Sequence, residues 1–463
     1  MTQARPARER WLRPPLADIG IAVFFVALTV AETWAGESDR APWQLTVALI
    51  GMAALAWRRV SPVGAAATLV VANIASNPDG DFSTILALVV ASYTVGFECF
   101  GRLRIVGVTG SNGKTTTKDL LAQVLDDAVA PEGSFNNEIG LPLTVLRADE
   151  ATRHLVLEMG ASAPGDLAYL TGIAPLDVAV VLTVGTAHLG GYGSPEALAE
   201  EKATLLDGLV PGGAALLNAD DARVAAMAGR PSLAAEDRTV RTFGVGGRAD
   251  LAAGGLRLDH GRAAFVVRSG EDRSAELTLR LVGEHHVTNA LAALGVALET
   301  GMDLDTAAER VSAAVPLSPH RMALTERADG VWILDDSYNA SPESMRAALR
   351  ALKEVAVAGR SFAVIGEMRE MGDASRAGHE EIGLDAVRLR IDHLLVVGEG
   401  AKPAHASAVR EGSWGDEAAY VATIDEARDF LDGRLLPGDT VLLKASHGSG
   451  LWRLADEMLG VDA

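Results

Sequence analysis

A glycine-rich loop between an apolar run and a helical stretch is the part of this sequence most clearly suited to chemistry. The run Arg104-Ile-Val-Gly-Val-Thr109 is typical of a buried strand, and a helix is expected over 118–126. Strand, glycine loop, Lys-Thr and helix is the order found in phosphate-binding loops. The glycines let backbone N–H groups approach phosphate oxygens, and the helix N-terminus adds positive charge. The residues predicted to surround the phosphates are Gly110, Ser111, Asn112, Gly113, Lys114, Thr115 and Thr116.

Two residues of this loop have specific predicted roles. The Lys114 ammonium is expected to reach the β- and γ-phosphates, and the Thr115 hydroxyl to hold Mg²⁺. The longer form of the motif has a glycine at the position that Val108 occupies here. The loop therefore has the shorter T-G-x-x-G-K-T form, and it predicts a nucleotide-binding site.

Three further polar residues stand where functional groups gather in α/β proteins. Glu158 and His188 each close a short apolar run, and Lys202 lies in a stretch with a helical pattern, 195–209. Ligands bind at the carboxyl ends of parallel strands, and a carboxylate suits Mg²⁺. Taken singly, the three are better explained as a strand-end surface acid, a hydrogen-bonded loop histidine and a solvated lysine.

Short apolar runs alternate with helical patterns after residue 104, which predicts an α/β fold. Short alternating strands such as 275–281 come first, and an apolar helix over 289–300 follows. Near the C-terminus the same alternation predicts a parallel α/β domain. Its expected strands are 331–334, 362–365, 393–397 and 440–443, with helices over 343–355 and 374–388.

The first 104 residues have a different composition from the rest of the chain. They carry 9 basic and 8 acidic residues, whereas the remainder carries 32 basic and 53 acidic ones. They also hold four apolar runs, each somewhat shorter than the ~20 residues that cross a bilayer as a helix. Arginines gather before the first run, between the second and third, and after the fourth, so the positive-inside rule places both ends in the cytosol. We predict an all-α membrane segment, with a soluble apolar helical domain as the alternative. The runs are 19–35, 43–57, 63–75 and 82–97.

Composition excludes several classes of protein. A net charge of -20 argues against a general nucleic-acid binder, which needs a basic face. The single cysteine, Cys99, excludes an internal disulfide and a cysteine-rich metal site, and it fits a reducing compartment. A hydrophobic content of 49% excludes a disordered chain.

A series of short motifs follows in a fixed order from residue 105 onward, and with it the chain resembles the Mur ligase family. The resemblance implies a central phosphate-loop ATPase domain over 105–315 and a C-terminal Rossmann-like α/β domain over 316–463, preceded here by the membrane segment 1–104. The motifs are Thr109–Thr116, Asn136-Asn-Glu-Ile-Gly140, Glu158-Met-Gly160, His188 with Lys202, Gly283-Glu-His285-His-Val-Thr-Asn289, Asp335-Asp-Ser-Tyr-Asn-Ala-Ser-Pro342, Gly366-Glu-Met368 and Lys444-Ala-Ser446.

The resemblance also implies a role for each matching position. Lys114, Glu158, His188 and Lys202 would form the catalytic group, in which Thr115, Glu158, His188 and an N-carbamoylated Lys202 would hold Mg²⁺. The side chains implied to contact the nucleotide beyond the loop are His285, Asn289, Arg321 and Asp336. Those implied to contact the other substrates are Asn136, Asn137, Tyr338, Asn339, Lys444 and Ser446.

The implied reaction is an ADP-forming peptide ligation of peptidoglycan synthesis, carried out by a monomeric catalytic unit. A carboxylate attacks the γ-phosphate of ATP, and an amine then displaces phosphate from the acyl phosphate, with two Mg²⁺ ions neutralising charge. The implied substrates are a UDP-muramoyl tripeptide and D-alanyl-D-alanine.

The N-terminal stretch leaves the carboxylate substrate open. Family members normally begin with a soluble domain that binds the UDP-sugar, and the apolar runs stand in its place. Three interpretations remain: a membrane-tethered cell-wall ligase with cytosolic catalytic domains, a membrane ligase acting on another acid, or a fused chain that binds ATP without its acceptor domain. A membrane sensor whose ATP-binding half is regulatory is the alternative class of function, but the sequence offers no phospho-acceptor helix.

Two single residues also depart from the family pattern. They are His286 and His447, where many relatives have Asn and Arg.

Overall fold

The computed structural model divides the chain into two compact units. One consists of Met1–Leu103 with Pro142–Leu155, and the other of Arg104–Leu141 with Val156–Ala463. The residues that the structure describes are 22–23, 25–27, 29–30, 42–55, 68–69, 72, 103–185, 192–234, 237–246, 248–270, 272–412 and 417–461.

The first unit contains one described helix of the predicted membrane segment. Helix α3 (Pro42–Ala54) lies within the second apolar run, and Met52 and Leu55 are buried. Among the described residues, none of the helices combines the length and the apolar character needed to cross a bilayer. The other three predicted runs lie largely or wholly outside the described residues.

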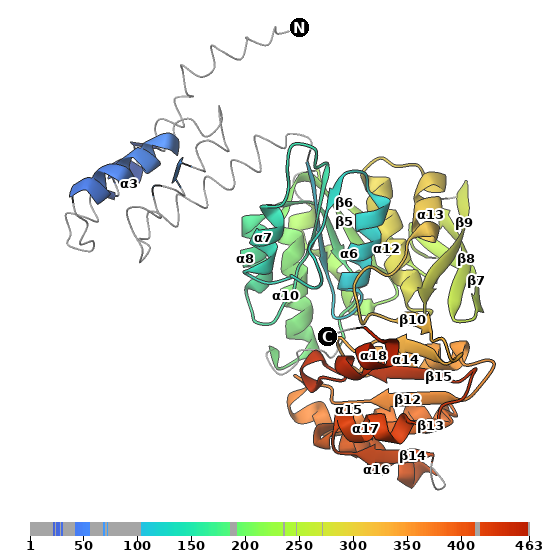
Figure 1. Ribbon diagram of the computed structural model, residues 1–463. Helices are drawn as coiled ribbons and strands as arrows, with labels where there is room; N and C mark the ends of the chain where they lie inside the picture. Colours follow the sequence, from blue (N-terminus) through green and yellow to red (C-terminus); the bar gives the residue numbers. More distant parts are fainter. Residues whose placement is uncertain are drawn as a thin grey trace. The chain divides into compact units, whose positions relative to one another are not determined.

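The second unit begins with a nine-stranded sheet of order β2-β3-β1-β4-β5-β6-β7-β8-β9 (Figure 1). Neighbouring strands from β1 through β4, β5 and β6 to β7 pair in parallel, and the β7–β8 and β8–β9 pairs are antiparallel. The strands are β1 (Arg104–Thr109), β2 (Ala128–Val129), β3 (His154–Glu158), β4 (Leu176–Val181), β5 (Leu209–Asn218), β6 (Thr239–Gly244), β7 (Leu251–Asp259), β8 (Arg262–Ser269) and β9 (Arg273–Val282).

Buried aliphatic residues explain why helices cover this sheet. Val106, Val108 and Val180 from the central strands pack with Leu120 of α6 and Leu294 of α12 in one core. Helix α10 packs on α8 and contacts β1, β4 and β5. The helices of this domain are α6 (Lys114–Val124), α8 (Asp166–Ile173), α10 (Pro195–Asp207), α11 (Ala222–Ala226), α12 (His286–Glu299) and α13 (Leu304–Ala313), and α7 (Gly140–Val145) begins in this unit and ends in the first.

The C-terminal domain is a six-stranded sheet between two layers of helices (Figure 1). Its order is β10-β11-β15-β12-β13-β14, and all pairs are parallel except β10–β11. The parallel prediction is therefore right except for the edge strand β10. The elements are β10 (Ala323–Glu326), β11 (Trp332–Asp335), α14 (Pro342–Val355), β12 (Ser361–Ile365), α15 (Ser375–Arg388), β13 (His393–Val397), α16 (Lys402–Glu411), β14 (Ala418–Val421), α17 (Ile424–Leu431), β15 (Thr440–Lys444) and α18 (Trp452–Leu459).

Alternation along the strands produces these two layers, because successive side chains point to opposite faces. Leu334 packs into the core that includes α14, α15 and α16. Its neighbour Ile333 packs into the core that includes α17 and α18. Phe362 and Ala363 divide between the two cores in the same way.

Candidate active site

The phosphate loop lies where the strand order of the nine-stranded sheet reverses. Strand β1 has β3 on one side and β4 on the other. The Met159 amide donates to the Val108 carbonyl (2.9 Å), and the Leu182 amide donates to the Thr109 carbonyl (3.0 Å). Crevices at such switch points, outside the carboxyl ends of the strands, are where α/β proteins bind ligands.

The loop is fastened to the segment that follows β4. The Ser111 amide donates to the Thr183 carbonyl (2.8 Å), and the Gly185 amide donates to the Ser111 hydroxyl (2.8 Å). The Lys114 ammonium donates to the Gly110 carbonyl (2.8 Å), so it folds back over the loop. The Asn112 amide also donates to the Thr183 hydroxyl at 3.2 Å, and together these contacts give the loop a cradle shape.

Asn289 supports this loop from helix α12. It is buried, and its amide group lies 3.1 Å from His286 Nδ1, while its oxygen accepts from the Thr117 hydroxyl at 3.4 Å. Gly113 has a left-handed φ of 88°, and a Cβ there would collide with the Asn289 oxygen. Asn289, which the resemblance places near the nucleotide, contacts the start of α6 through its carboxamide.

The two histidines beside it are held neutral. Burial lowers the pKa of His285 to about 4, with Lys444 adding to the effect and Asp336 opposing it. Burial also lowers the pKa of His286 well below its ordinary value. Neither ring therefore adds charge to this side of the site near neutral pH.

Glu158 offers a carboxylate oxygen to the crevice. The side chain is 1% exposed, and one oxygen accepts from the Asn136 amide at 2.8 Å. The other oxygen is buried and has no hydrogen-bond partner among the described residues. Burial lowers the pKa of the nearby Lys114, and the charge of Glu158 opposes that effect. An unpaired buried carboxylate oxygen is costly unless a cation completes it, so Glu158 fits the predicted Mg²⁺ ligand.

Lys202 approaches the same point from α10, whose N-terminus is capped by Ser194. Its side chain is 2% exposed, and its ammonium has no hydrogen bond or ion pair within the part of the chain that is described. Burial lowers the pKa of Lys202 to about 7, with Lys114 adding to the effect and Glu201 opposing it. The Glu201 carboxylate accepts from the backbone amides of Gly165 (2.8 Å) and Leu167 (2.9 Å).

Two of the predicted metal ligands need separate mention. His188 lies outside the described residues. The Thr115 hydroxyl lies 3.0 Å from the Ser134 hydroxyl. In the described ranges, no group of three or more His, Cys, Asp or Glu side chains is placed to hold a metal ion. Of the four predicted metal ligands, the structure describes Thr115, Glu158 and Lys202.

Arg321 connects the C-terminal domain to this cradle. Its guanidinium donates to the Ser134 hydroxyl at 3.0 Å and stacks over the Tyr338 ring at 4.2 Å. Its Nε is buried without a partner among the described residues, which leaves a donor available. Ser134 was not found from the sequence, although it lies two residues before the Asn136 motif.

The other C-terminal site residues are already engaged with one another. Lys444 is 1% exposed, and its ammonium contacts the Asp336 carboxylate (2.5 Å) and the Asn339 carbonyl (2.9 Å). The Ser446 hydroxyl accepts from the Arg369 amide at 2.9 Å. Lys444 and Asp336, predicted to meet different substrates, therefore form one buried ion pair.

Three other observations complete the site. The Asn137 side chain accepts from the Gly140 amide at 2.9 Å and so caps the start of α7. The rings of Tyr338 and His447 are 5.2 Å apart. Sequence reasoning missed His320, whose Nδ1 lies 2.7 Å from the Asp335 carboxylate.

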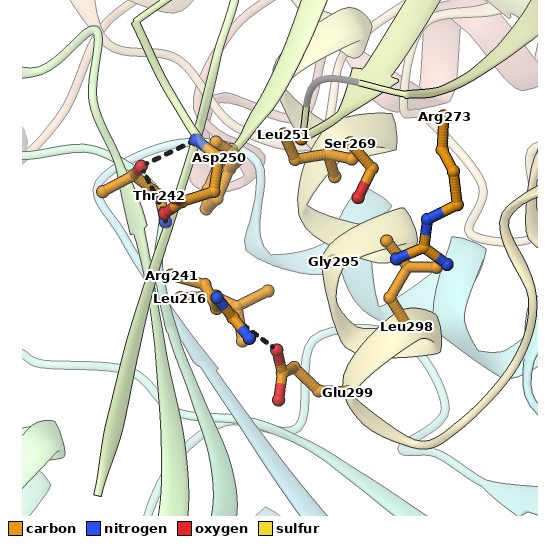
Figure 2. Close-up of a pocket in the computed structure, with 12 residues that line it drawn as sticks. Leu216, Arg241, Thr242, Asp250, Leu251, Ser269, Arg273, Gly295, Leu298 and Glu299 are labelled. Carbon is orange, nitrogen blue, oxygen red and sulfur yellow. Dashed lines mark hydrogen bonds and ion pairs between the residues drawn. The ribbon is translucent and has the colours of Figure 1, made fainter.

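A separate hollow of about 320 Å³ lies at the other end of α12 (Figure 2). Its charged groups are largely paired: Arg241 contacts Glu299 at 3.2 Å, and Asp250 accepts from Thr242 at 2.8 Å. None of the predicted site residues lines it. This hollow does not belong to the cradle around the phosphate loop.

Comparison with known families places these features in context. Residues 108–297 match the Mur ligase middle domain, and residues 320–447 match the Mur ligase, glutamate ligase domain. Residues 8–115 match a domain of unknown function, DUF7134. The chain belongs to the Mur ligase family.

Individual relatives share most of the chain. It is 44% identical to the UDP-N-acetylmuramoyl-tripeptide–D-alanyl-D-alanine ligase of Mycobacterium tuberculosis over 426 residues, covering 87% of this chain and 82% of the relative. It is 33% identical to the ligase of the same name from Bacillus subtilis over 365 residues, covering 77% and 76%.

Solved structures agree with this placement. A MurF crystal structure from Acinetobacter baumannii matches with a TM-score of 0.72 at 29% identity, covering 81% of each chain. MurF from Thermotoga maritima in complex with ADP matches with a TM-score of 0.66 at 30% identity, covering 81% of this chain and 84% of that one.

Proposed function

We propose that this protein is an ATP-dependent, ADP-forming ligase that joins D-alanyl-D-alanine to a UDP-N-acetylmuramoyl tripeptide. The observation that carries the chemistry is that Lys114 of the phosphate loop lies close enough to Glu158 and to Lys202 for their charges to affect one another. The choice of substrates is supported by the name of the mycobacterial relative, which is 44% identical over 426 residues.

The reaction has two balanced steps. A substrate carboxylate oxygen attacks the γ-phosphorus of ATP, and the bond to the β–γ bridging oxygen breaks, which gives an acyl phosphate and ADP. The dipeptide amine then attacks the acyl carbon, phosphate leaves with the bonding pair, and the amine loses a proton. Phosphoryl transfer of this kind needs positioning and charge stabilisation more than covalent help from the protein.

The residues around the phosphate loop supply both the positioning of the phosphates and the stabilisation of their charge. Backbone N–H groups of the loop and the N-terminus of α6 bind phosphate oxygens, while Lys114 moves from the Gly110 carbonyl to the phosphates. Arg321 approaches from the C-terminal domain with an unpaired Nε–H. Thr115, Glu158, His188 and Lys202 would hold Mg²⁺, which when bound neutralises charge on the phosphates.

Lys202 is included in that set as its N-carbamate. Lys202 is 2% exposed and has no ion pair among the described residues, and burial lowers its pKa to about 7, so its neutral amine is well populated near neutral pH. Addition of CO₂ to its neutral amine, with loss of a proton, turns it into an oxygen ligand of the type that Mg²⁺ prefers.

The N-terminal residues 1–104 are proposed to attach the ligase to the inner face of a membrane. The support is the four apolar runs and the arginines placed at their cytosolic ends. Residues 8–115 match a domain of unknown function, so the match assigns no role to this stretch, and the membrane attachment is tested directly.

The activity test is ADP release by the full chain, purified in detergent, with Mg²⁺-ATP and the two substrates added separately and then together. We expect release only when both are present. ATP binding without release would mean that the carboxylate substrate is a different acid.

A further inference from the structure

The Ser341 hydroxyl lies at the start of α14, where the C-terminal domain meets the phosphate loop. The Ser341 oxygen accepts from the Ser344 amide (3.3 Å), and the Ser344 oxygen accepts from the Ser341 amide (2.9 Å). This reciprocal pair is a capping box, which satisfies two backbone donors at the helix N-terminus. Ser341 is 4% exposed.

The single hydroxyl proton of Ser341 has two acceptors within reach. One is the Asn112 side-chain oxygen in the phosphate loop, at 3.3 Å across the domain interface. The other is the Ser344 hydroxyl oxygen in its own helix, at 3.2 Å. The Ser344 proton is directed to the Ser341 carbonyl at 3.1 Å, so the Ser344 oxygen is free to accept. A hydroxyl has one proton to give, so the two contacts are alternatives.

This arrangement removes the usual cost of breaking a buried contact. A buried donor left without an acceptor loses its interaction with water and gains none in return, which is costly. Here the Ser341 proton keeps an acceptor whether or not the C-terminal domain touches the loop. Domains joined by a single linker move relative to one another unless their interface is large and apolar, and this contact suits such a motion.

We propose that Ser341 is a positioning residue. Its hydroxyl donates to the Ser344 oxygen when the domains are apart, and to the Asn112 side-chain oxygen when the C-terminal domain closes on an occupied phosphate loop. The Asn112 amide donates to the Thr183 hydroxyl at 3.2 Å, which fixes the Asn112 backbone and therefore its side-chain oxygen. The positive end of α14 is drawn toward phosphates held by the loop. The inference rests on the proposed nucleotide chemistry, and it adds the contact that couples occupancy to domain closure.

The first test separates the contact from the helix cap. Ser341→Ala removes both the hydrogen bond to Asn112 and the cap of α14. Asn112→Ala removes only the hydrogen bond, and Ser341→Thr keeps the hydrogen bond and the cap. Thr423→Ala is the matched control, because Thr423 caps α17 of the same domain through the Glu426 amide at 3.2 Å. We expect the first two variants to lower kcat about three- to tenfold, the range of one net hydrogen bond. Thr423→Ala should lower the unfolding temperature and leave kcat unchanged, and Ser341→Thr should retain most of the activity.

A double-mutant cycle then tests the pairing itself. Asn112→Ala combined with Ser341→Ala should be no slower than the slower single variant, since both remove the same contact. Fully additive losses would show that the two residues act independently and would overturn the proposal. An equal loss of kcat in Thr423→Ala would do the same, because it would assign the effect to helix stability.

Amide hydrogen exchange gives a readout that does not depend on the acceptor substrate. In the full chain with Mg²⁺ and a non-hydrolysable ATP analogue, we expect exchange at 343–345 to slow about three- to tenfold, as one hydrogen bond allows. Asn112→Ala should abolish this nucleotide-dependent slowing. If the wild-type chain shows slowing that survives in Asn112→Ala, the proposal fails even where ligase activity is present. If amide exchange slows as expected but no ADP is released with the two proposed substrates, the substrate assignment is wrong and the proposed coupling is supported.

Discussion

At the scale of single residues, Lys114 is the sharpest test of the phosphate loop. Its ammonium is the only described lysine group that donates to the loop carbonyl of Gly110. We expect Lys114→Ala to lower kcat for ADP formation about a hundredfold or more, the cost of removing one preorganised charge-stabilising donor. Lys402→Ala, at an exposed position paired with Glu399, is the control and should keep wild-type turnover. Turnover like the wild type in Lys114→Ala would contradict the assignment.

Lys202 allows a test of chemical rescue. Lys202→Ala should be inactive, and formate or acetate should restore part of the ADP release, because a small carboxylate can fill the space that the carbamate leaves. Lys202→Arg is the control, since it keeps a cation, fills the space and cannot be carbamoylated. Native mass spectrometry of the wild type should show the added mass of one CO₂, lost on acidification. Full activity in Lys202→Arg would rule out the carbamate as a required ligand.

At the scale of elements, the sequence predicted strands better than it predicted where helices begin. Strand β1 matches its predicted bounds, and β3 ends at Glu158 as expected, because a strand buried on both faces appears as a continuous apolar run. Helix α6 was expected from residue 118, yet it begins at Lys114. Its start is set by the left-handed Gly113 and the loop contacts, which apolar periodicity does not record.

Partners across domains were not predictable from local patterns. The motifs located Glu158, Lys202 and the loop, and the structure brings them together. They did not reveal that Lys444 pairs with Asp336, or that Ser134 links Thr115 to Arg321. Such contacts depend on how two separately folded sheets meet, which leaves no periodic signal in the chain.

Gly113 tests how tightly the loop is built into its surroundings. Gly113→Ala forces a Cβ into a left-handed conformation, which costs about 1–2 kcal/mol, and also drives it against the Asn289 oxygen. Gly301→Ala is the control, since Gly301 has a similar φ of 95° with open space around it. We expect denaturant unfolding to show a larger loss of stability for Gly113→Ala, accompanied by loss of nucleotide binding. Equal losses in the two variants would mean that the contact with Asn289 adds nothing.

At the scale of the whole molecule, the chain joins a charge-balanced N-terminal stretch to an acidic ligase. The mycobacterial alignment covers 87% of this chain, which is more than residues 104–463 make up, so it extends into that stretch. The resemblance is therefore not confined to the two sheet domains. The groups predicted to act on ATP all lie after residue 104. We therefore expect the N-terminal residues to determine where in the cell the ligase lies, and not to take part in the reaction.

The single cysteine makes that location measurable. Cys99 follows the fourth apolar run and is predicted to face the cytosol, whereas Ser38 lies in the connection predicted to face outward. A membrane-impermeant maleimide should label Cys99 in inside-out vesicles and not in intact spheroplasts. In a Cys99→Ser background, Ser38→Cys should show the reverse pattern, and Cys99→Ser alone should stay unlabelled. Recovery of the chain in the soluble fraction, or labelling of both positions from the same side, would contradict four membrane spans and favour the soluble apolar domain.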